Sequence, residues 1–190
     1  MKILITGCKG YIGSVLVKYL SEKNFEVTGF DISYFDECLL SSEYTNYNFK
    51  KKDIRNLVLS DIEGFDVVIH LAALSNDPLG EFNLNLTEQI NFVAAIKLSE
   101  LSKKAGVKRF IYLSSQSMYG ISKLANELDE DNSQKNPVTK YASTKWESEK
   151  YIKRLSSEKF TTICLRPSTV FGKSPRLRCD IVFNNLVACA

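Results

Sequence analysis

Short apolar runs alternate with amphipathic segments along most of the chain. The apolar runs predict strands at residues 2–6, 26–31, 46–50, 66–71, 109–114 and 161–166. The amphipathic segments predict helices at residues 11–22, 54–61, 84–105 and 138–157. Several predicted strands are apolar at nearly every position, which is typical of strands buried on both faces. The pattern therefore predicts an α/β fold, a Rossmann-type doubly wound parallel sheet with helices on both faces.

The composition of the chain argues against several classes of function. The 190 residues are 44% hydrophobic and 25% charged, which is typical of a soluble globular protein of one domain. A formal net charge of +3 is too small to indicate nucleic acid or a membrane as a partner, and no apolar run approaches the roughly 18 residues that span a bilayer. The five cysteines are odd in number and widely spaced, so we expect reduced thiols, a cytoplasmic location and no metal site.

Three glycines follow the first predicted strand. Gly7, Gly10 and Gly13 lie at three-residue spacing, just before and within the start of the helix 11–22. Glycines let a backbone approach a diphosphate closely, and a helix N-terminus presents free N–H groups to it. Asp31 ends the second predicted strand, where a carboxylate accepts hydrogen bonds from an adenosine ribose and repels a 2′-phosphate. The sequence therefore predicts NAD as the cofactor, and the alternative is a tight turn with a surface aspartate.

Tyr141 and Lys145 lie four residues apart near the start of the helix 138–157, and therefore on one helical face. A phenol, with a pKa of about 10, is a poor base at neutral pH, but a neighbouring ammonium and a nicotinamide cation favour the phenolate. Such a tyrosine exchanges a proton with a sugar hydroxyl. The alternative is a wedged tyrosine beside a surface lysine.

Further residues lie at the carboxyl ends of predicted strands, where parallel sheets bind their ligands. The hydroxyl of Ser115 is expected to face the nicotinamide and to share charge on the reacting oxygen, unless it belongs to a plain serine-rich turn. Ala72 and Ala73 would admit the cofactor close to the backbone, whereas His70 is interpreted as a packed strand-end residue. Asp53 is expected against the adenine amino group, at a helix N-cap, or in both roles.

A set of motifs occurs in one order along the chain: Thr6-Gly7-x-x-Gly10-x-x-Gly13, Asp31, Asp53-x-Arg55, His70-Leu71-Ala72-Ala73, Ser114-Ser115 with Tyr119-Gly120, Tyr141-x-x-x-Lys145 and Arg166-Pro167-x-x-Val170-Phe171-Gly172. Together they resemble the extended short-chain dehydrogenase/reductase family, in its nucleotide-sugar epimerase/dehydratase branch. The resemblance covers almost the whole chain. It implies an NAD-dependent enzyme that acts on a nucleotide-diphosphate sugar.

The resemblance also implies roles for single residues. The catalytic residues would be Ser115, Tyr141 and Lys145. The residues around NAD would be Thr6, Gly7, Gly10, Tyr11, Ile12, Gly13, Asp31, Asp53, Ile54, Leu71, Ala72, Ala73, Asn91, Ser114, Tyr141, Lys145, Pro167 and Ser168. The residues around the substrate would be Ser115, Gln116, Asn184, Asn185 and Arg176. Arg178 would add positive charge near the substrate diphosphate, and the alternative for both arginines is a solvated basic loop.

One departure from the family refines the expected reaction. Dehydratases of the family carry an Asp-Glu pair directly after the catalytic hydroxyl, and decarboxylases a glutamate two residues after it, whereas this chain has Gln116 and Ser117. The resemblance therefore implies a 4-epimerase, in which Tyr141 deprotonates the sugar 4-hydroxyl and a transient 4-keto sugar turns before hydride returns. The alternatives are a reductase or dehydrogenase of the same fold and a non-catalytic NAD-binding regulator.

The second departure is length, because family members add a smaller C-terminal domain that holds the substrate. We therefore expect residues 1–175 to form the NAD-binding Rossmann domain and residues 176–190 the start of a truncated substrate-binding region. The substrate domain would be largely absent, in a fragment that binds NAD but is poorly active. A homodimer through the helices 84–105 and 138–157 is expected, with neither nucleic acid nor a membrane as a partner.

Overall fold

The computed structural model describes residues 1–34, 36–40, 47–75, 77–121 and 128–190. Its centre is a six-stranded sheet in the order β3-β2-β1-β4-β5-β6, in which every neighbouring pair is parallel. The strands are β1 (Lys2–Thr6), β2 (Glu26–Asp31), β3 (Asn48–Lys51), β4 (Val67–His70), β5 (Arg109–Leu113) and β6 (Thr161–Leu165). The predicted doubly wound parallel sheet is confirmed, because the strand order runs outwards in both directions from β1.

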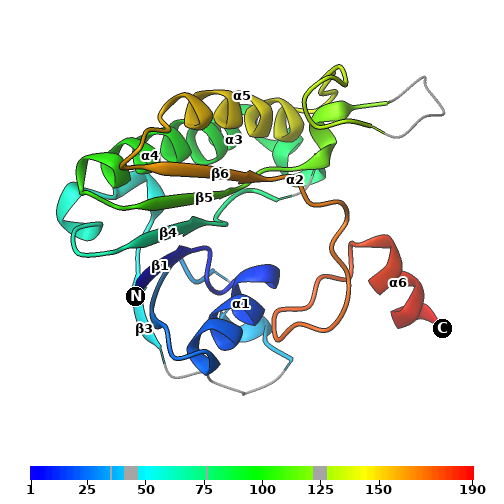
Figure 1. Ribbon diagram of the computed structural model, residues 1–190. Helices are drawn as coiled ribbons and strands as arrows, with labels where there is room; N and C mark the ends of the chain where they lie inside the picture. Colours follow the sequence, from blue (N-terminus) through cyan, green and yellow to red (C-terminus); the bar gives the residue numbers. More distant parts are fainter. Residues whose placement is uncertain (35, 41–46, 76, 122–127) are drawn as a thin grey trace.

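Helices cover both faces of this sheet. They are α1 (Tyr11–Glu22), α2 (Asp77–Phe82), α3 (Leu84–Glu88), α4 (Ala94–Lys104), α5 (Lys140–Arg154) and α6 (Val182–Cys189). Figure 1 shows α3, α4 and α5 together over one face, α1 on the other, and α6 to one side near the C-terminus. Alternate strand residues point to opposite faces of the sheet. Leu4 and Val68 belong to the core beneath α4 and α5, whereas Ile3 and Ile5 pack with Val17 of α1.

The helix predicted at 54–61 is wrong. The chain forms two 3-10 turns there, Ile54–Asn56 and Leu59–Asp61, separated by an extended region at Leu57, whose side chain is fully buried. The Asp53 carboxylate accepts a hydrogen bond of 2.9 Å from the backbone N–H two residues later. Such side-chain bonds compete with helical backbone bonds, so apolar spacing alone does not extend the helix.

The other helices differ from prediction mainly at their ends and in one interruption. The run predicted at 84–105 contains a π-helical turn, Gln89–Val93, between α3 and α4. α5 begins at Lys140 because the Thr139 hydroxyl accepts a hydrogen bond of 3.1 Å from the Ala142 N–H and so caps the helix. The sequence pattern does not reveal α2, which is six residues long and contains a proline and a glycine.

One face of β6 is poorly covered. Ile163 is 37% exposed and Leu165 is 48% exposed, whereas Cys164 between them packs against the core beneath α4 and α5. These two side chains therefore lie on the face opposite that core. α6 also exposes apolar side chains, with Val182 at 72% and Leu186 at 65%.

Candidate active site

Parallel pairing brings the carboxyl ends of β1, β4, β5 and β6 to one edge of the sheet. Backbone hydrogen bonds join the loops that leave these strands. The Leu71 N–H donates to the Thr6 carbonyl at 3.0 Å, and the Gln116 N–H donates to the Pro167 carbonyl at 3.2 Å. The glycine loop, the alanines after β4, the serines after β5 and Pro167-Ser168 after β6 therefore share this edge.

Close backbone contacts shape the glycine loop. Gly7 has a φ of +77°, and a Cβ there would lie 2.7 Å from the Ala72 nitrogen. A Cβ on Gly13 would lie 2.0 Å from the Gly7 carbonyl oxygen, so both positions require glycine. α1 begins after Gly10 with no side-chain cap among the described residues and no acidic residue in its first turn. Its first N–H groups and positive dipole end are therefore available to an anion.

Asp31 ends β2 beside the glycine loop. One carboxylate oxygen accepts a hydrogen bond from the Lys9 N–H at 3.0 Å, and the other accepts one from the Ser33 N–H at 2.9 Å. The Lys9 ammonium turns to Asp36 at 2.8 Å. Two backbone bonds thus orient the Asp31 carboxylate, and each of its oxygens retains acceptor capacity for a ribose hydroxyl.

Asp53 caps the turn that follows β3, as the N-cap interpretation predicted. It accepts hydrogen bonds from the Arg55 N–H at 2.9 Å and from the Arg55 Nε at 3.0 Å. Bonding to this guanidinium holds the pKa of Asp53 below its ordinary value. The neighbouring Ile54 is 6% exposed and belongs to the core. A contact of either residue with adenine stays a prediction.

Lys145 is buried, so its interpretation as a surface lysine is wrong. It is 3% exposed, its Nζ donates to the Leu113 carbonyl at 2.8 Å, and this nitrogen lies 6.0 Å from the centroid of the Tyr141 ring. Burial lowers the pKa of Lys145 to about 7 and raises the pKa of Tyr141. At neutral pH the phenol is therefore protonated, and forming the phenolate depends on positive charge brought to Tyr141.

Ser115 joins the loop after β5 to this pair. Its Oγ accepts a hydrogen bond from the Ser117 N–H at 3.1 Å and donates to the Ser117 Oγ at 3.0 Å. Hydrogen bonding with Ser115 lowers the pKa of Tyr141, against the larger effect of burial. The preceding Ser114 is 2% exposed, and its Oγ has no partner among the described residues. Ser115 thus lies in a serine-rich turn, and its role towards the nicotinamide and the reacting oxygen stays a prediction.

His70 is a packed strand-end residue, as predicted. It is 1% exposed, and its Nδ1 lies 2.6 Å from the Thr6 Oγ1. Its ring stacks on that of Tyr112 with 5.8 Å between centroids. Burial lowers the pKa of His70 to about 3, so the imidazole is neutral at physiological pH. Thr6 is fully buried with it.

Asn91 holds the loop that leaves β4. Its buried side chain accepts a hydrogen bond from the Leu74 N–H at 2.8 Å and donates to the Leu74 carbonyl at 3.0 Å. Asn91 lies in the π-helical turn, and its own carbonyl accepts a hydrogen bond of 2.9 Å from the Ser148 hydroxyl. Sequence reasoning missed Ser148. The signal for it is its position three residues after Lys145, on the buried face of α5.

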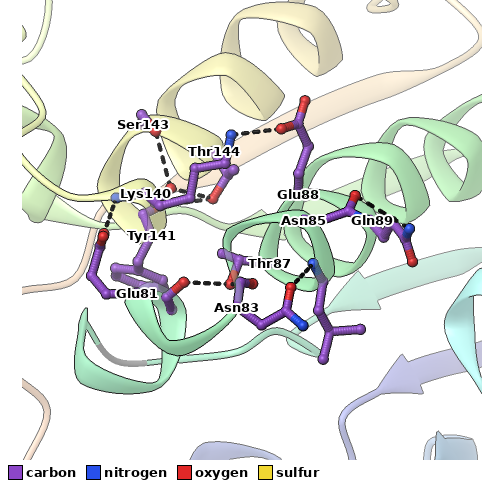
Figure 2. A network of polar contacts seen from close by, with 12 residues as sticks. Glu81, Asn83, Asn85, Thr87, Glu88, Gln89, Lys140, Tyr141, Ser143 and Thr144 are labelled. Carbon is purple, nitrogen blue, oxygen red and sulfur yellow. Dashed lines mark hydrogen bonds and ion pairs between the residues drawn. The ribbon is translucent and has the colours of Figure 1, made fainter.

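α2 packs against the start of α5 beside Tyr141, a contact that the sequence analysis also missed. A Cβ on Gly80 would lie 3.2 Å from the Tyr141 Cβ. Figure 2 shows Lys140 between two carboxylates: its N–H donates to Glu81 at 2.6 Å and its Nζ to Glu88 at 2.6 Å. These bonds hold the backbone at the residue that precedes Tyr141.

The segment between β6 and α6 returns to the glycine loop. The Tyr11 hydroxyl donates to the Gly172 carbonyl at 2.7 Å and accepts from the Asn184 Nδ2 at 3.3 Å. Asn184 is 7% exposed, and its Oδ1 accepts from the Gly172 N–H at 3.0 Å. Asn185 is exposed and bonds the Cys179 carbonyl at 3.2 Å. The Asn184 amide is therefore engaged within the protein, and contact of either asparagine with a sugar nucleotide stays a prediction.

Arg176 and Arg178 are half-buried in the same segment rather than freely solvated. The Arg176 Nη1 donates to the Leu177 carbonyl at 3.1 Å, and the Arg178 Nε donates to the Asp180 carboxylate at 3.0 Å. A contact of either arginine with the substrate diphosphate stays a prediction.

Neither a metal centre nor a membrane-spanning helix is found in the described parts of the chain. No group of three or more His, Cys, Asp or Glu side chains there could hold a metal ion. No helix there is long and apolar enough to cross a bilayer. All five cysteines are unpaired.

Comparison with known sequences places this site among related proteins. The profile of the NAD dependent epimerase/dehydratase family matches residues 3–188. Protein CapI of Staphylococcus aureus is 32% identical over 184 residues, covering 90% of this chain and 55% of that protein. The dTDP-D-glucose 4,6-dehydratase of Mus musculus is 30% identical over 182 residues, covering 90% of this chain and 51% of that enzyme. The chain thus spans about half the length of the curated relatives that it matches.

Solved structures agree with this comparison. MoeE5 in complex with UDP-glucose and NAD has a TM-score of 0.85 at 26% identity, covering 100% of this chain and 60% of that one. UDP-glucuronic acid 4-epimerase from Bacillus cereus in complex with NAD has a TM-score of 0.80 at 28% identity, covering 98% of this chain and 61% of that one. Epimerases and dehydratases are therefore both among the similar proteins.

Proposed function

This chain belongs to the NAD dependent epimerase/dehydratase family, and we propose that the protein is a nucleotide-sugar 4-epimerase within it. Its substrate would be a nucleotide-diphosphate sugar. The observation that carries the proposal is the site at the sheet edge, where Ser115, Tyr141 and Lys145 meet with no carboxylate next to Ser115 in the sequence. The glycine loop and Asp31 would bind the cofactor.

The residues present fit NAD. The uncapped start of α1 suits a diphosphate, and the Asp31 carboxylate, which two backbone bonds orient, retains acceptor capacity for a ribose hydroxyl. The unpartnered Ser114 Oγ at the end of β5 is a further polar group for the cofactor. When bound, NAD supplies the acceptor and the donor of a hydride. MoeE5 and the Bacillus cereus epimerase, both similar to this chain, were solved with NAD.

Tyr141 and Ser115 would manage the proton of the reacting hydroxyl. Tyr141 would take the proton from the sugar 4-hydroxyl, while the Ser115 hydroxyl donates a hydrogen bond to the same oxygen. Loss of that proton and of a hydride from C4 leaves a 4-keto sugar. Return of the proton and the hydride after the sugar has turned gives the C4 epimer. Lys145 would hold the nicotinamide ribose and add charge near Tyr141.

The turn after Ser115 favours epimerisation over elimination. Gln116 and Ser117 occupy the positions where the family's dehydratases carry acidic residues, and Ser117 is bonded to Ser115 through both its N–H and its hydroxyl. Elimination of water requires a base for a carbon-bound proton, and an amide or a hydroxyl is a poor base at neutral pH. Ser115, Tyr141 and Lys145 remain, and these suffice for proton exchange at the sugar 4-hydroxyl oxygen.

The test uses the protein expressed from its complete coding sequence. It is incubated with UDP-, dTDP-, GDP- and CDP-sugars in D₂O, and the products are identified by NMR. We expect a C4 epimer without solvent deuterium in the sugar. A 6-deoxy-4-keto product would indicate a dehydratase, and steady NADH production a dehydrogenase. NAD binding without turnover of any sugar would favour a regulator.

Two matched variants of α5 assign the proton transfer. Tyr141→Phe should lower the turnover rate by roughly 10²–10⁴-fold, the usual contribution of a general acid or base, while NAD affinity is retained. Tyr151→Phe is the control, because it removes a phenol from the same helix. Among the described residues the Tyr151 hydroxyl bonds only Glu100, which is not part of the proposed site, so this variant should retain turnover. Equal activity of both variants would contradict the role of Tyr141.

A further inference from the structure

Lys145 of α5 lies over the ring of Tyr112, a residue of β5 that the proposed reaction does not use. The Lys145 Nζ is 4.8 Å from the centroid of this ring, within the roughly 6 Å at which an aromatic face attracts a cation. The same Nζ donates to the Leu113 carbonyl at 2.8 Å. Tyr112 is fully buried and Lys145 is 3% exposed, so water screens this contact little. Two neighbouring residues of β5 thus hold the ammonium, one through its ring and one through its backbone.

The carboxylates on the elements packed against α5, and the phenol in the turn after Ser115, all bond other groups. These side chains and their partners are Asp77 with Thr139, Glu81 and Glu88 with Lys140, Glu100 with Tyr151, Glu147 with Lys150, and Glu149 and Tyr119 with Arg166. Lys145 is therefore a buried cation that no carboxylate pairs with in the described parts of the chain.

The remaining titratable groups around the contact are uncharged at neutral pH. Burial raises the pKa of Tyr112 and of Tyr141, and it raises the pKa of Cys164 in β6 to about 12. Burial, with a smaller contribution from the charge of Lys145, lowers the pKa of His70 to about 3. The groups that attract the ammonium are thus the Leu113 carbonyl and the electron-rich face of the Tyr112 ring.

Packing fixes the ring of Tyr112. The His70 ring stacks on it with 5.8 Å between centroids, and the His70 Nδ1 is 2.6 Å from the Thr6 Oγ1. The Tyr112 hydroxyl is buried without a hydrogen-bond partner among the described residues. The Ser148 hydroxyl, which lowers the pKa of Tyr112 against the larger effect of burial, donates to the Asn91 carbonyl at 2.9 Å. The ring, rather than the hydroxyl, is therefore the part of Tyr112 that contacts a functional group.

We propose that Tyr112 is a positioning residue, whose ring face keeps Lys145 charged and holds its ammonium beside Tyr141. The proposal deepens the proposed function, because it rests on Lys145 as the cation that assists Tyr141. Without the attraction of the ring, Lys145 would remain buried with one carbonyl as its partner, so it should release its proton at lower pH. A neutral Lys145 would no longer favour the Tyr141 phenolate.

The test is the titration of Lys145, which needs no substrate. The protein is labelled with [ε-¹³C]lysine, and NMR follows each ε-carbon against pH with NAD present. The signal absent from Lys145→Met identifies residue 145. In Tyr112→Phe, which keeps the ring, the midpoint should stay at its wild-type value. In Tyr112→Leu, which removes the ring, it should fall by about one pH unit or more.

A series of fluorinated rings separates attraction by the ring from packing. Phenylalanine and its 4-fluoro, 3,5-difluoro and 3,4,5-trifluoro forms are placed at position 112 through a reassigned stop codon. Each fluorine draws electron density away from the ring face and changes the shape of the ring little. The Lys145 midpoint should fall step by step as fluorines are added. If Tyr112→Leu does not fold, this series decides.

Phe110 supplies the matched control in the same strand. It is fully buried two residues before Tyr112, and its ring packs on that of Phe160 with 6.3 Å between centroids. The same fluorinated rings at position 110 should leave the Lys145 midpoint unchanged. A constant midpoint across the series at position 112, or an equal fall with the series at position 110, would overturn the proposal. So would an equal fall in Tyr112→Phe and Tyr112→Leu, because it would assign the effect to the hydroxyl.

This titration is independent of the reaction. Absence of sugar-nucleotide turnover in the wild-type protein would refute the 4-epimerase but would leave the graded shift of the Lys145 midpoint intact. Turnover without that shift would refute the role of Tyr112 alone.

Discussion

Single residues differ in how far their roles follow from spacing. The need for glycine at positions 7 and 13 was predictable, because three-residue spacing after a strand implies close backbone approach, and the contacts of Gly7 and Gly13 bear it out. The partners of Asn184 were not predictable. The Arg178 carbonyl is six residues away, and Gly172 and Tyr11 are twelve and 173 residues away, so only the fold brings all three to Asn184. The role of a side chain can be predicted from the sequence when its partner lies nearby in the chain.

His70 gives the free energy of unfolding a defined pH dependence. Its pKa is about 3 in the folded protein against an ordinary 6.5, so the unfolded chain binds the proton more strongly. Stability is therefore lost as the pH falls from about 6.5 towards 3. In His70→Gln, which keeps a hydrogen-bond partner for Thr6, we expect this part of the loss to disappear. Urea unfolding between about pH 4 and pH 7 measures both proteins, and parallel pH profiles would contradict the expectation.

Elements follow from the sequence when they are long and internally bonded. The central strands β1, β2 and β4 were predictable because they are buried on both faces, so their apolar runs are nearly unbroken. The two 3-10 turns in 54–61 were mistaken for a helix, because Asp53 and Asp61 bond backbone N–H groups in ways that apolar spacing does not reveal. α2 is stabilised by contacts with α5, which no local pattern records.

The buried ion pair of Glu149 and Arg166 joins α5 to the end of β6. The Arg166 Nη2 lies 2.6 Å from the Glu149 carboxylate, and the side chains are 8% and 1% exposed respectively. Glu149→Gln leaves the guanidinium buried without its counter-charge, so we expect the free energy of unfolding to fall by about 3 kcal/mol. Urea unfolding at neutral pH measures this loss.

The matched control removes an exposed ion pair of the same helix. Lys150 lies 2.7 Å from Glu147, with side chains 38% and 52% exposed, and Lys150→Gln should change the free energy of unfolding by less than about 1 kcal/mol. Similar losses in the two variants would mean that burial adds nothing to the pair of Glu149 and Arg166.

At the scale of the molecule, the sequence predicted the sheet but not what covers its outer surfaces. Alternation of strands and helices with right-handed crossovers leads to the observed strand order. An apolar position on a helix, however, can face the core or another chain, and periodicity is the same for both. The homodimer through residues 84–105 and 138–157 is therefore a proposal.

Two valines with equal exposure test this dimer. Val93 lies within residues 84–105 and is 52% exposed, and Val58 lies elsewhere and is also 52% exposed. We expect sedimentation velocity to show a dimer for the wild type and for Val58→Glu, and a monomer for Val93→Glu, because a buried unpaired carboxylate opposes association. A dimer that persists in Val93→Glu would place the interface on another surface.

The strand order leaves two outer strands, and they are not equally protected. An outer strand offers unpaired N–H and C=O groups to any passing strand, and lysines along it discourage such pairing. β3 carries Lys50 and Lys51 in its four residues, whereas β6, Thr161–Leu165, has no charge at all. If an additional strand joins this sheet, from this polypeptide or from another copy, we therefore expect it to pair with β6 rather than with β3.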